Sequence, residues 1–217
     1  MDSLHHPVHF NRVQLCGRTV TSPELSHSNH GENFFRLLLS VPRLSGQEDT
    51  LPVLIPGYLI TDLAPAEGDF LSLSGQLRSF NNKSPVGPRL ILSVFAQELS
   101  PQYTAPLNHI RLCGTVCKEP TLRRTPLGRE ICDVILAVNR RYGRADYLPC
   151  ISWGAVAEQT ALLSVGSSMA LEGRVQSRTY NKIVAGQPTE RIAYEVSVMR
   201  PLPPEDFLCG SFSPDFH

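Results

Sequence analysis

The segment Asn11-Arg-Val-Gln-Leu-Cys-Gly17 occurs a second time, with small changes, as Asn108-His-Ile-Arg-Leu-Cys-Gly114. The two segments are 97 positions apart, and this spacing continues along the chain. It relates Gly31 to Gly128, Leu37 to Val134, Leu39 to Leu136, Val41 to Val138, Arg43 to Arg140, and Pro52 to Pro149. The spacing becomes 98 where Leu73-Ser-Gly75 matches Leu171-Glu-Gly173 and Ser79 matches Ser177, and 102 where Arg89 matches Arg191. A register held over this length indicates two copies of one structural unit.

Each copy has the pattern of a small barrel. In the second copy, alternating or continuous apolar residues predict strands at 110–116, 130–138, 147–153, 169–177 and 192–199, and residues 155–163 have helical spacing. Short strands with one helix after the third fit the partly open OB barrel. We therefore predict an all-β protein with two tandem OB-fold five-stranded barrels, each with one short helix after strand 3. In the first copy, Pro56 and Pro65 leave room only for a short helix.

The domain boundaries follow from the repeat. The predicted parts are an N-terminal extension (1–10), OB domain 1 (11–99), a linker (100–107), OB domain 2 (108–200) and a short C-terminal tail (201–217). The proline-bearing, uncharged segment at 100–106 is typical of a linker between domains.

Composition excludes several classes of protein. The chain has 217 residues, of which 41% are hydrophobic and 18% charged, so a disordered tail is excluded. Its longest apolar runs are much shorter than the roughly 20 residues of a membrane helix, and no signal-peptide pattern opens the chain. The six cysteines do not have the close spacing of a disulfide framework. We expect reduced thiols, no contact with a membrane, and a cytoplasmic protein.

The formal net charge is zero, but the two copies differ in charge. Residues 11–99 hold seven Lys and Arg against eight Asp and Glu, a net charge of −1. Residues 108–200 hold thirteen against eight, a net charge of +5. Only the second copy therefore has the charge expected of a partner for a polyanion.

The second copy also places aromatic residues among its cations. The set comprises Arg140, Arg141, Tyr142, Arg144, Tyr147, Trp153, Arg174, Arg178, Tyr180 and Lys182. Single-stranded nucleic acid exposes charged phosphates and unstacked bases, so cations interleaved with flat rings suit both. Each ring alone also fits ordinary strand packing, and each arginine fits an ordinary solvated surface.

The second copy resembles the bacterial single-stranded DNA-binding protein family over nearly its whole length. The resemblance rests on the order and spacing of Asn108 to Gly114, Glu119-Pro120, Thr125-Pro-Leu-Gly128, Leu136-Ala-Val-Asn139, Trp153-Gly154, Val165-Gly166, Leu171-Glu-Gly-Arg174 and Tyr194-Glu-Val196. It implies a non-enzymatic OB barrel that coats single strands during replication, recombination and repair in the bacterial cytoplasm and nucleoid. It also implies that bases stack on Tyr142, Tyr147, Trp153 and Tyr180. Three of these are tyrosine where the family often has tryptophan, which implies weaker stacking.

The first copy keeps the barrel pattern but loses most of these rings. Ser45, Thr50 and Pro56 stand where the second copy has Tyr142, Tyr147 and Trp153, and Phe80 lies close to the place of Tyr180. We expect this copy to serve assembly, or to extend the groove with Phe80 as a stacking residue and Arg78 and Lys83 as phosphate contacts. Asn81, Asn82 and Arg89 flank these positions.

Further expectations concern partners. Members of the family with one barrel per chain form tetramers, so two barrels per chain imply a homodimer with four OB folds. The C-terminal Pro203-Pro-Glu-Asp-Phe207 and Pro214-Asp-Phe-His217 weakly resemble the family's partner-docking tip, and a frayed terminus is the other interpretation. No motif predicts a catalytic residue, a metal site or a cofactor. Two alternatives stay open: an interaction adaptor for replication or recombination proteins, and an RNA binder.

Overall fold

The computed structural model of the chain describes residues 9–61, 63–82, 89–101, 105–184 and 187–207. The first barrel contains β1 (Phe10–Thr19), β2 (Glu24–Asn29), β3 (Glu32–Pro42), β4 (Glu48–Pro56), α1 (Gly57–Ile60), β5 (Phe70–Asn81) and β6 (Leu90–Ser100). The second contains β7 (Leu107–Val116), β8 (Thr121–Arg124), β9 (Glu130–Asn139), the 3-10 turn η1 (Arg141–Gly143), β10 (Ala145–Trp153), α2 (Ala155–Ala161), β11 (Ser168–Val184) and β12 (Gln187–Leu202). A 3-10 turn, η2 (Pro204–Phe207), follows. The predicted all-β fold with one short helix per barrel is confirmed.

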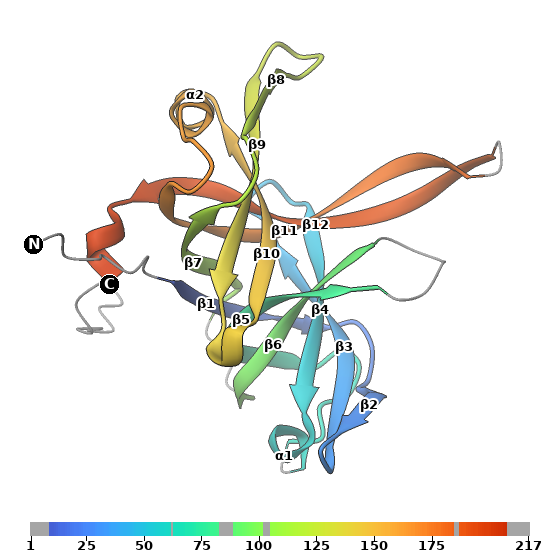
Figure 1. Ribbon diagram of the computed structural model, residues 1–217. Coiled ribbons are helices and arrows are strands. Elements are labelled where there is room, and N and C mark those ends of the chain that lie inside the picture. Colours follow the sequence, from blue (N-terminus) through green and yellow to red (C-terminus); the bar gives the residue numbers. More distant parts are fainter. Residues whose placement is uncertain (1–8, 62, 83–88, 102–104, 185–186, 208–217) are drawn as a thin grey trace, which may run out of the picture.

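The strands form a single sheet that curls into a barrel at each end (Figure 1). Their order is β2-β3-β4-β6-β5-β1-β7-β11-β12-β10-β9-β8. Pairing of Arg18 with Ser40 joins β1 to β3, and pairing of Thr115 with Ala137 joins β7 to β9. These two contacts close the barrels.

Each barrel has one strand more than the five that we predicted. The added strands, β2 and β8, are exposed along their whole length and stand at the two ends of the sheet. They are extensions of β3 and β9 through hairpins. Backbone pairing and exposed side-chain contacts such as Arg36–Glu24 and Arg123–Asp133 hold them, without buried apolar residues. The hydrophobic pattern therefore gave no signal for them.

The core follows the repeat. Leu39 and Leu136, which match at the spacing of 97, are both fully buried, as are Val41 and Val138. Alternate residues of these strands face the barrel interior because side chains of a strand point to opposite faces in turn. The same alternation decides which residues face outward.

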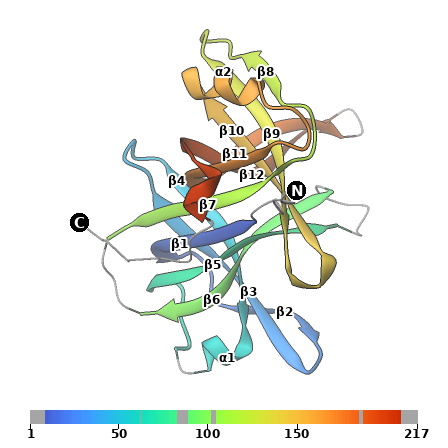
Figure 2. The same ribbon diagram turned by 60° about the vertical axis from the view of Figure 1, so that its left-hand side comes forward.

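The two barrels are joined edge to edge through β1 and β7. These strands pair antiparallel from Phe10 opposite Cys113 to Cys16 opposite Leu107. They lie side by side in both views, with β5 beyond one and β11 beyond the other (Figures 1 and 2). Hydrogen-bonded pairing therefore continues across the domain boundary through six neighbouring strands, in the order β6, β5, β1, β7, β11 and β12.

The β11–β12 hairpin is longer than the sequence pattern indicated. Pairing continues from Arg174 opposite Ser197 to Val184 opposite Gln187, and the hairpin projects from its barrel as an arm (Figure 1). Its outer part includes Tyr180 and Lys182. Cross-strand hydrogen bonds continue beyond the core there, so the strands do not end where the buried residues end.

The C-terminal turn is packed rather than free. The centroids of the Phe207 and Phe10 rings are 5.0 Å apart. Arg111 Cζ lies 4.8 Å from the centroid of the Phe207 ring. Phe207 is therefore held against β1 and β7, which contradicts a frayed end at 203–207. A docking role of this segment stays a prediction. The second part of that expectation, Pro214 to His217, lies outside the described residues.

Two other features are absent from the part of the chain that the structure describes. None of the helices there has the length and apolar content to cross a bilayer. No group of three or more His, Cys, Asp or Glu side chains among the described residues could hold a metal ion.

Candidate nucleic-acid interface

The strand β10 carries two of the predicted stacking residues on its outer face. Leu148, Cys150 and Ser152 are buried inside the barrel. The alternate residues Tyr147 and Trp153 are 50% and 40% exposed. They are six residues apart, or about 20 Å at 3.3 Å per residue. Both rings are therefore accessible, at opposite ends of one strand.

Strand register brings the predicted cations to the same face. β12 lies parallel to β10, with Ser197 beside Ile151, and β11 pairs with β12, with Arg174 opposite Ser197. Directly paired residues share a face of a sheet. Arg174, Arg178 and Tyr180 therefore lie on the face of Tyr147 and Trp153, which we call the ring face.

A groove of about 580 Å³ is hollowed into the ring face. One wall is the turn between β3 and β4 of the first barrel, and the other is β11 of the second. The lining residues are Arg43, Gln47, Glu48, Trp153, Arg174, Gln176, Ser177, Arg178 and Thr179. Trp153 and two predicted phosphate contacts therefore meet in one groove, to which both barrels contribute.

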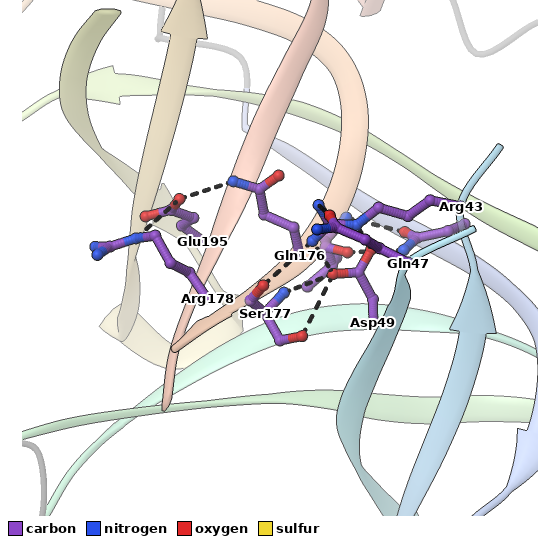
Figure 3. Close-up of polar contacts among 9 residues, drawn as sticks. Arg43, Gln47, Asp49, Gln176, Ser177, Arg178 and Glu195 are labelled. Carbon is purple, nitrogen blue, oxygen red and sulfur yellow. Dashed lines mark hydrogen bonds and ion pairs between the residues drawn. The ribbon is translucent and has the colours of Figure 1, made fainter. Parts of the chain in front are cut away.

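A buried carboxylate, Glu195, positions one of the cations of this groove, Arg178. Gln176 Nε2 donates to Glu195 Oε1 at 2.7 Å, and Arg178 Nε lies 3.7 Å from the same oxygen (Figure 3). The Arg178 guanidinium is also 5.6 Å from the centroid of the Tyr180 ring. Its side chain stays half exposed. Arg178 is thus held beside a ring while its charge faces solvent.

Arg43 and Asp49 form a buried ion pair within the first barrel (Figure 3). Both side chains also contact Ser177 of the second barrel, and we call these three residues the first clasp. Arg43 Nε donates to Asp49 Oδ2 at 2.8 Å, and a terminal nitrogen of Arg43 donates to the Ser177 carbonyl at 3.2 Å. The Ser177 N–H donates to Asp49 Oδ1 at 2.8 Å. The hydrogen bond to Asp49 raises the pKa of Arg43. A hairpin of the first barrel thereby grips the backbone of the second.

Arg140, Asp146 and Ser79 form the second clasp, which has the same construction in the opposite direction. Arg140 Nε donates to Asp146 Oδ2 at 2.5 Å and its terminal nitrogen to the Ser79 carbonyl at 3.0 Å. The Ser79 N–H donates to Asp146 Oδ1 at 2.6 Å. The Arg140 side chain is only 16% exposed. The Arg140 guanidinium, which we predicted to contact phosphate, therefore lies against Asp146 and Ser79.

The sequence contains a signal for the clasps that the predicted site did not include. An arginine precedes an aspartate by six positions in both copies, as Arg43 with Asp49 and Arg140 with Asp146. Both pairs keep the spacing of 97, and the serines that they contact also match. Polar residues that recur in register with a core are candidates for contacts between the two units.

The second clasp places the turn between β9 and β10 on the first barrel. The Tyr147 N–H donates to Ser79 Oγ at 2.8 Å, and the Arg140 guanidinium lies 5.6 Å from the Phe80 ring centroid. Tyr142 is almost fully exposed in this turn, with a left-handed φ of 65°, and Arg144 is exposed beside it. The predicted rings therefore divide into a group near Trp153 and a group near Phe80.

The corresponding face of the first barrel carries a pocket of about 610 Å³. Most of its surface is apolar, from side chains such as Leu38, Leu54 and Phe80, and polar residues such as Glu24 and Arg36 also line it. The residues at the positions of the missing rings are Ser45, which is exposed, Thr50, which is half-buried, and Pro56, which is buried. Phe80 is the ring that remains, and it is 36% exposed.

Arg78 lies on this face beside the second clasp. It donates to Gln76 Oε1 at 2.6 Å, and its guanidinium is 4.8 Å from the Phe95 ring centroid. Burial, and then the positive charge of Arg140, lower the pKa of Arg78. Of the other predicted phosphate contacts, Lys182 is exposed on the β11 arm, whereas Lys83 and the side chain of Arg141 lie outside what the structure describes.

Comparisons with known proteins agree with this architecture. The sequence model of the single-strand binding protein family matches residues 107–200. The single-stranded DNA-binding protein B of Bacillus subtilis (strain 168) is 38% identical over 107 residues, which are 45% of this chain and 95% of that protein. The single-stranded DNA-binding protein of Clostridium tetani (strain Massachusetts / E88) is 36% identical over 97 residues, 42% of this chain and 65% of that protein.

A solved structure extends the likeness to the first barrel. The wild-type single-stranded DNA binding protein from Thermus aquaticus superposes with a TM-score of 0.71 at 21% identity, covering 96% of this chain and 97% of that chain. At this identity the superposition shows a shared fold over almost the whole chain. Together with the match to the Bacillus protein, it leads to one conclusion: the chain belongs to the single-strand binding protein family.

Proposed function

We propose that the chain binds single-stranded DNA, largely without regard to sequence and without catalysing a reaction. The observation that carries this proposal is the ring face, where the exposed ring of Trp153 lies in one groove with Arg174 and Arg178. The half-buried ring of Tyr180 lies beside Arg178, and the exposed ring of Tyr147 lies at the other end of β10. Bases of any identity can stack on such rings, and the phosphates between them would contact the arginines. Names of the related proteins support the same ligand. Arg144 and Lys182 are further exposed contacts to phosphate in this proposal.

The proposed work of the second barrel is to hold the strand, and that of the first is to extend the groove at Phe80 and Tyr142. Such binding would protect single strands that are exposed during replication, recombination or repair in a bacterial cytoplasm. The loss of most of the matching rings from the first barrel makes its stacking contribution smaller. Its charge of −1 in residues 11–99 argues in the same direction.

Trp153 is the only tryptophan, so it reports on the site directly. We expect a deoxythymidine oligomer to quench its fluorescence, and added salt to reverse the quenching because counterions compete for the phosphates. Trp153→Ala should weaken binding by about 1 to 3 kcal/mol, roughly 5- to 150-fold in Kd. The measurement for the variant is anisotropy of a labelled oligomer at fixed salt.

Tyr58→Ala is the matched control, since Tyr58 is an exposed ring on α1, outside the ring face. It should leave the Kd unchanged. If Trp153→Ala binds as tightly as Tyr58→Ala while Trp153 remains unquenched in the parent, base stacking at this position is refuted.

The alternatives differ from this proposal in what they bind. An adaptor for replication or recombination proteins would have no salt-dependent affinity for a single strand. An RNA binder would prefer a ribouridine oligomer over the matched deoxythymidine oligomer in competition, because only RNA offers the 2′-OH. The apolar pocket near Phe80 favours the adaptor as the second candidate.

We also propose that two chains form a homodimer with four barrels. Closed two-fold symmetry is the commonest arrangement of soluble oligomers. Sedimentation equilibrium should give about twice the 24.0 kDa of one chain. A mass of one chain throughout the micromolar range would contradict the proposal.

A further inference from the structure

Gln176 carries a buried amide that lines the same groove as Trp153. The residue is 6% exposed, and its Nε2 donates to Glu195 Oε1 at 2.7 Å. An ionised carboxylate only accepts hydrogen bonds, so the amide must turn its NH2 group toward Glu195 and its oxygen away, as Figure 3 shows. Glu195 is itself 7% exposed. A buried neighbour therefore fixes the orientation of the Gln176 amide.

The oxygen of this amide has no donor from the protein. Among the residues that the structure describes, the side-chain hydrogen bond of Gln176 is the one to Glu195, and it uses the nitrogen. The oxygen is reached from solvent through the groove. When a bound base displaces the water there, an acceptor left unmatched costs free energy, whereas a donor on the base restores the hydrogen bond.

The wall contributed by the first barrel adds a second acceptor to the groove. Glu48 is exposed there, and one oxygen of its carboxylate accepts from Ser40 Oγ. The polar groups of the groove thus divide by type. Arg174 and Arg178 are donors that suit phosphates, whereas Gln176 and Glu48 offer acceptors to the edge of a base.

The matching place in the first barrel carries a donor instead. At the spacing of 98, Arg78 stands where the second barrel has Gln176. Gln76, two residues before it on the outer face of β5, accepts from Arg78 through Oε1 at 2.6 Å. The glutamine oxygen is therefore occupied in the first barrel and available in the second.

Resting on the proposed function, we propose that Gln176 contacts the base bound in this groove and favours cytosine over thymine or uracil. Cytosine has an amino group, N4, where thymine has the carbonyl oxygen O4. The amino group donates to Gln176 Oε1, whereas O4 would face a second acceptor. The remaining donor of thymine, N3–H, lies between two carbonyl oxygens, so an acceptor that approaches it also meets these oxygens.

Glu195 is the positioning residue in this proposal, because it prevents the Gln176 amide from turning its NH2 group to the base. The preference applies to one base in the groove. Stacking and phosphate contacts remain the same for every sequence, so the chain still binds all single strands.

The test compares the Kd of the full chain for labelled deoxycytidine and deoxyuridine oligomers of equal length. Neither base has the methyl group of thymine, and they differ only at position 4 and in the proton on N3. Fixed salt and a mildly alkaline buffer keep the phosphate contacts equal and cytosine unprotonated. The parent should bind the deoxycytidine oligomer about 3- to 10-fold more tightly, the effect of one hydrogen bond.

Two variants and a control assign the preference to this amide. Gln176→Met keeps the length of the side chain but removes the amide, so the ratio of the two Kd values should fall to about 1. Glu195→Gln lets the Gln176 amide turn, which should also bring the ratio toward 1, while the loss of a negative charge strengthens binding of both oligomers. Gln76→Met makes the same change on β5, where Arg78 occupies the oxygen, and should keep the parental ratio.

The outcomes separate this inference from the proposed function. If the parent binds neither oligomer, single-strand binding itself fails. If it binds both equally, or deoxyuridine more tightly, the contact of Gln176 with the base is disproved while the proposed function stands. A parental ratio in Gln176→Met disproves the contact as well, and a parental ratio in Glu195→Gln disproves the positioning role. A smaller folded fraction weakens both oligomers by the same factor, so the ratio stays informative for a destabilised variant.

Discussion

Asp49→Asn should lower the free energy of unfolding by about 3 to 5 kcal/mol, the range for a buried ion pair that loses one partner. The Asp49 side chain is 1% exposed. Its carboxylate accepts from Arg43 and from the Ser177 N–H. Asparagine keeps the shape, but it leaves the Arg43 guanidinium buried without a counter-charge. Urea denaturation followed by circular dichroism measures the loss.

An exposed pair with the same spacing provides the control for this experiment. Arg124 and Glu130 are also six residues apart in a hairpin and form an ion pair at 2.7 Å, but the Arg124 side chain is mostly exposed. Glu130→Gln should leave the unfolding midpoint unchanged, because solvent screens exposed pairs. Equal midpoints for Asp49→Asn and Glu130→Gln would show that the first clasp contributes nothing to stability.

Gly75→Ala is expected to destabilise the first barrel by about 1 to 3 kcal/mol, the usual cost of inserting an atom into a packed site. Gly75 lies at an irregularity in the pairing of β5 with β6. A Cβ atom there would lie 2.0 Å from the Phe95 carbonyl oxygen and 2.9 Å from its carbon. These are backbone atoms, so the strands must separate to accept the methyl group. Glycine at such a position marks a close approach of two backbones.

Thermal unfolding of Gly75→Ala beside Ser74→Ala tests this reasoning. Ser74 is the preceding residue, and its exposed hydroxyl donates to Glu98. Ser74→Ala should change the midpoint little. Gly173, which matches Gly75, would meet the Ser197 carbonyl oxygen at 2.2 Å, so Gly173→Ala should behave as Gly75→Ala does. A parental midpoint for Gly75→Ala would mean that β5 and β6 separate at no cost.

The sequence was sufficient for the barrels because repeat spacing and strand alternation both report on the core. Leu136 and Val138 alternate with outward residues, and that alternation also placed Tyr147 and Trp153 on one face. It could not give the strands β2 and β8 or the length of the β11 arm. Those segments depend on backbone pairing, which leaves no hydrophobic period.

The sequence predicted the position of a site residue only where that position depends on its own strand or on a directly paired strand. Arg174 and Arg178 reach the ring face through register within a barrel. Arg140 does not, because the turn that follows β9 crosses to the other barrel, where Asp146 and Ser79 take up its donors. Contacts between the two barrels depend on how the barrels are placed against each other. The alternation of residues along one strand carries no information on this placement.

Because β1 pairs with β7, the two halves are joined by a shared sheet as well as by the covalent chain. Backbone hydrogen bonds along these strands and two reciprocal clasps already hold the halves together. Two independent polypeptides making the same edge contact would present the same rings and arginines. The two-barrel chain is in this sense equivalent to a pair of single-barrel subunits, with the difference that one half can change its surface while the other keeps its own.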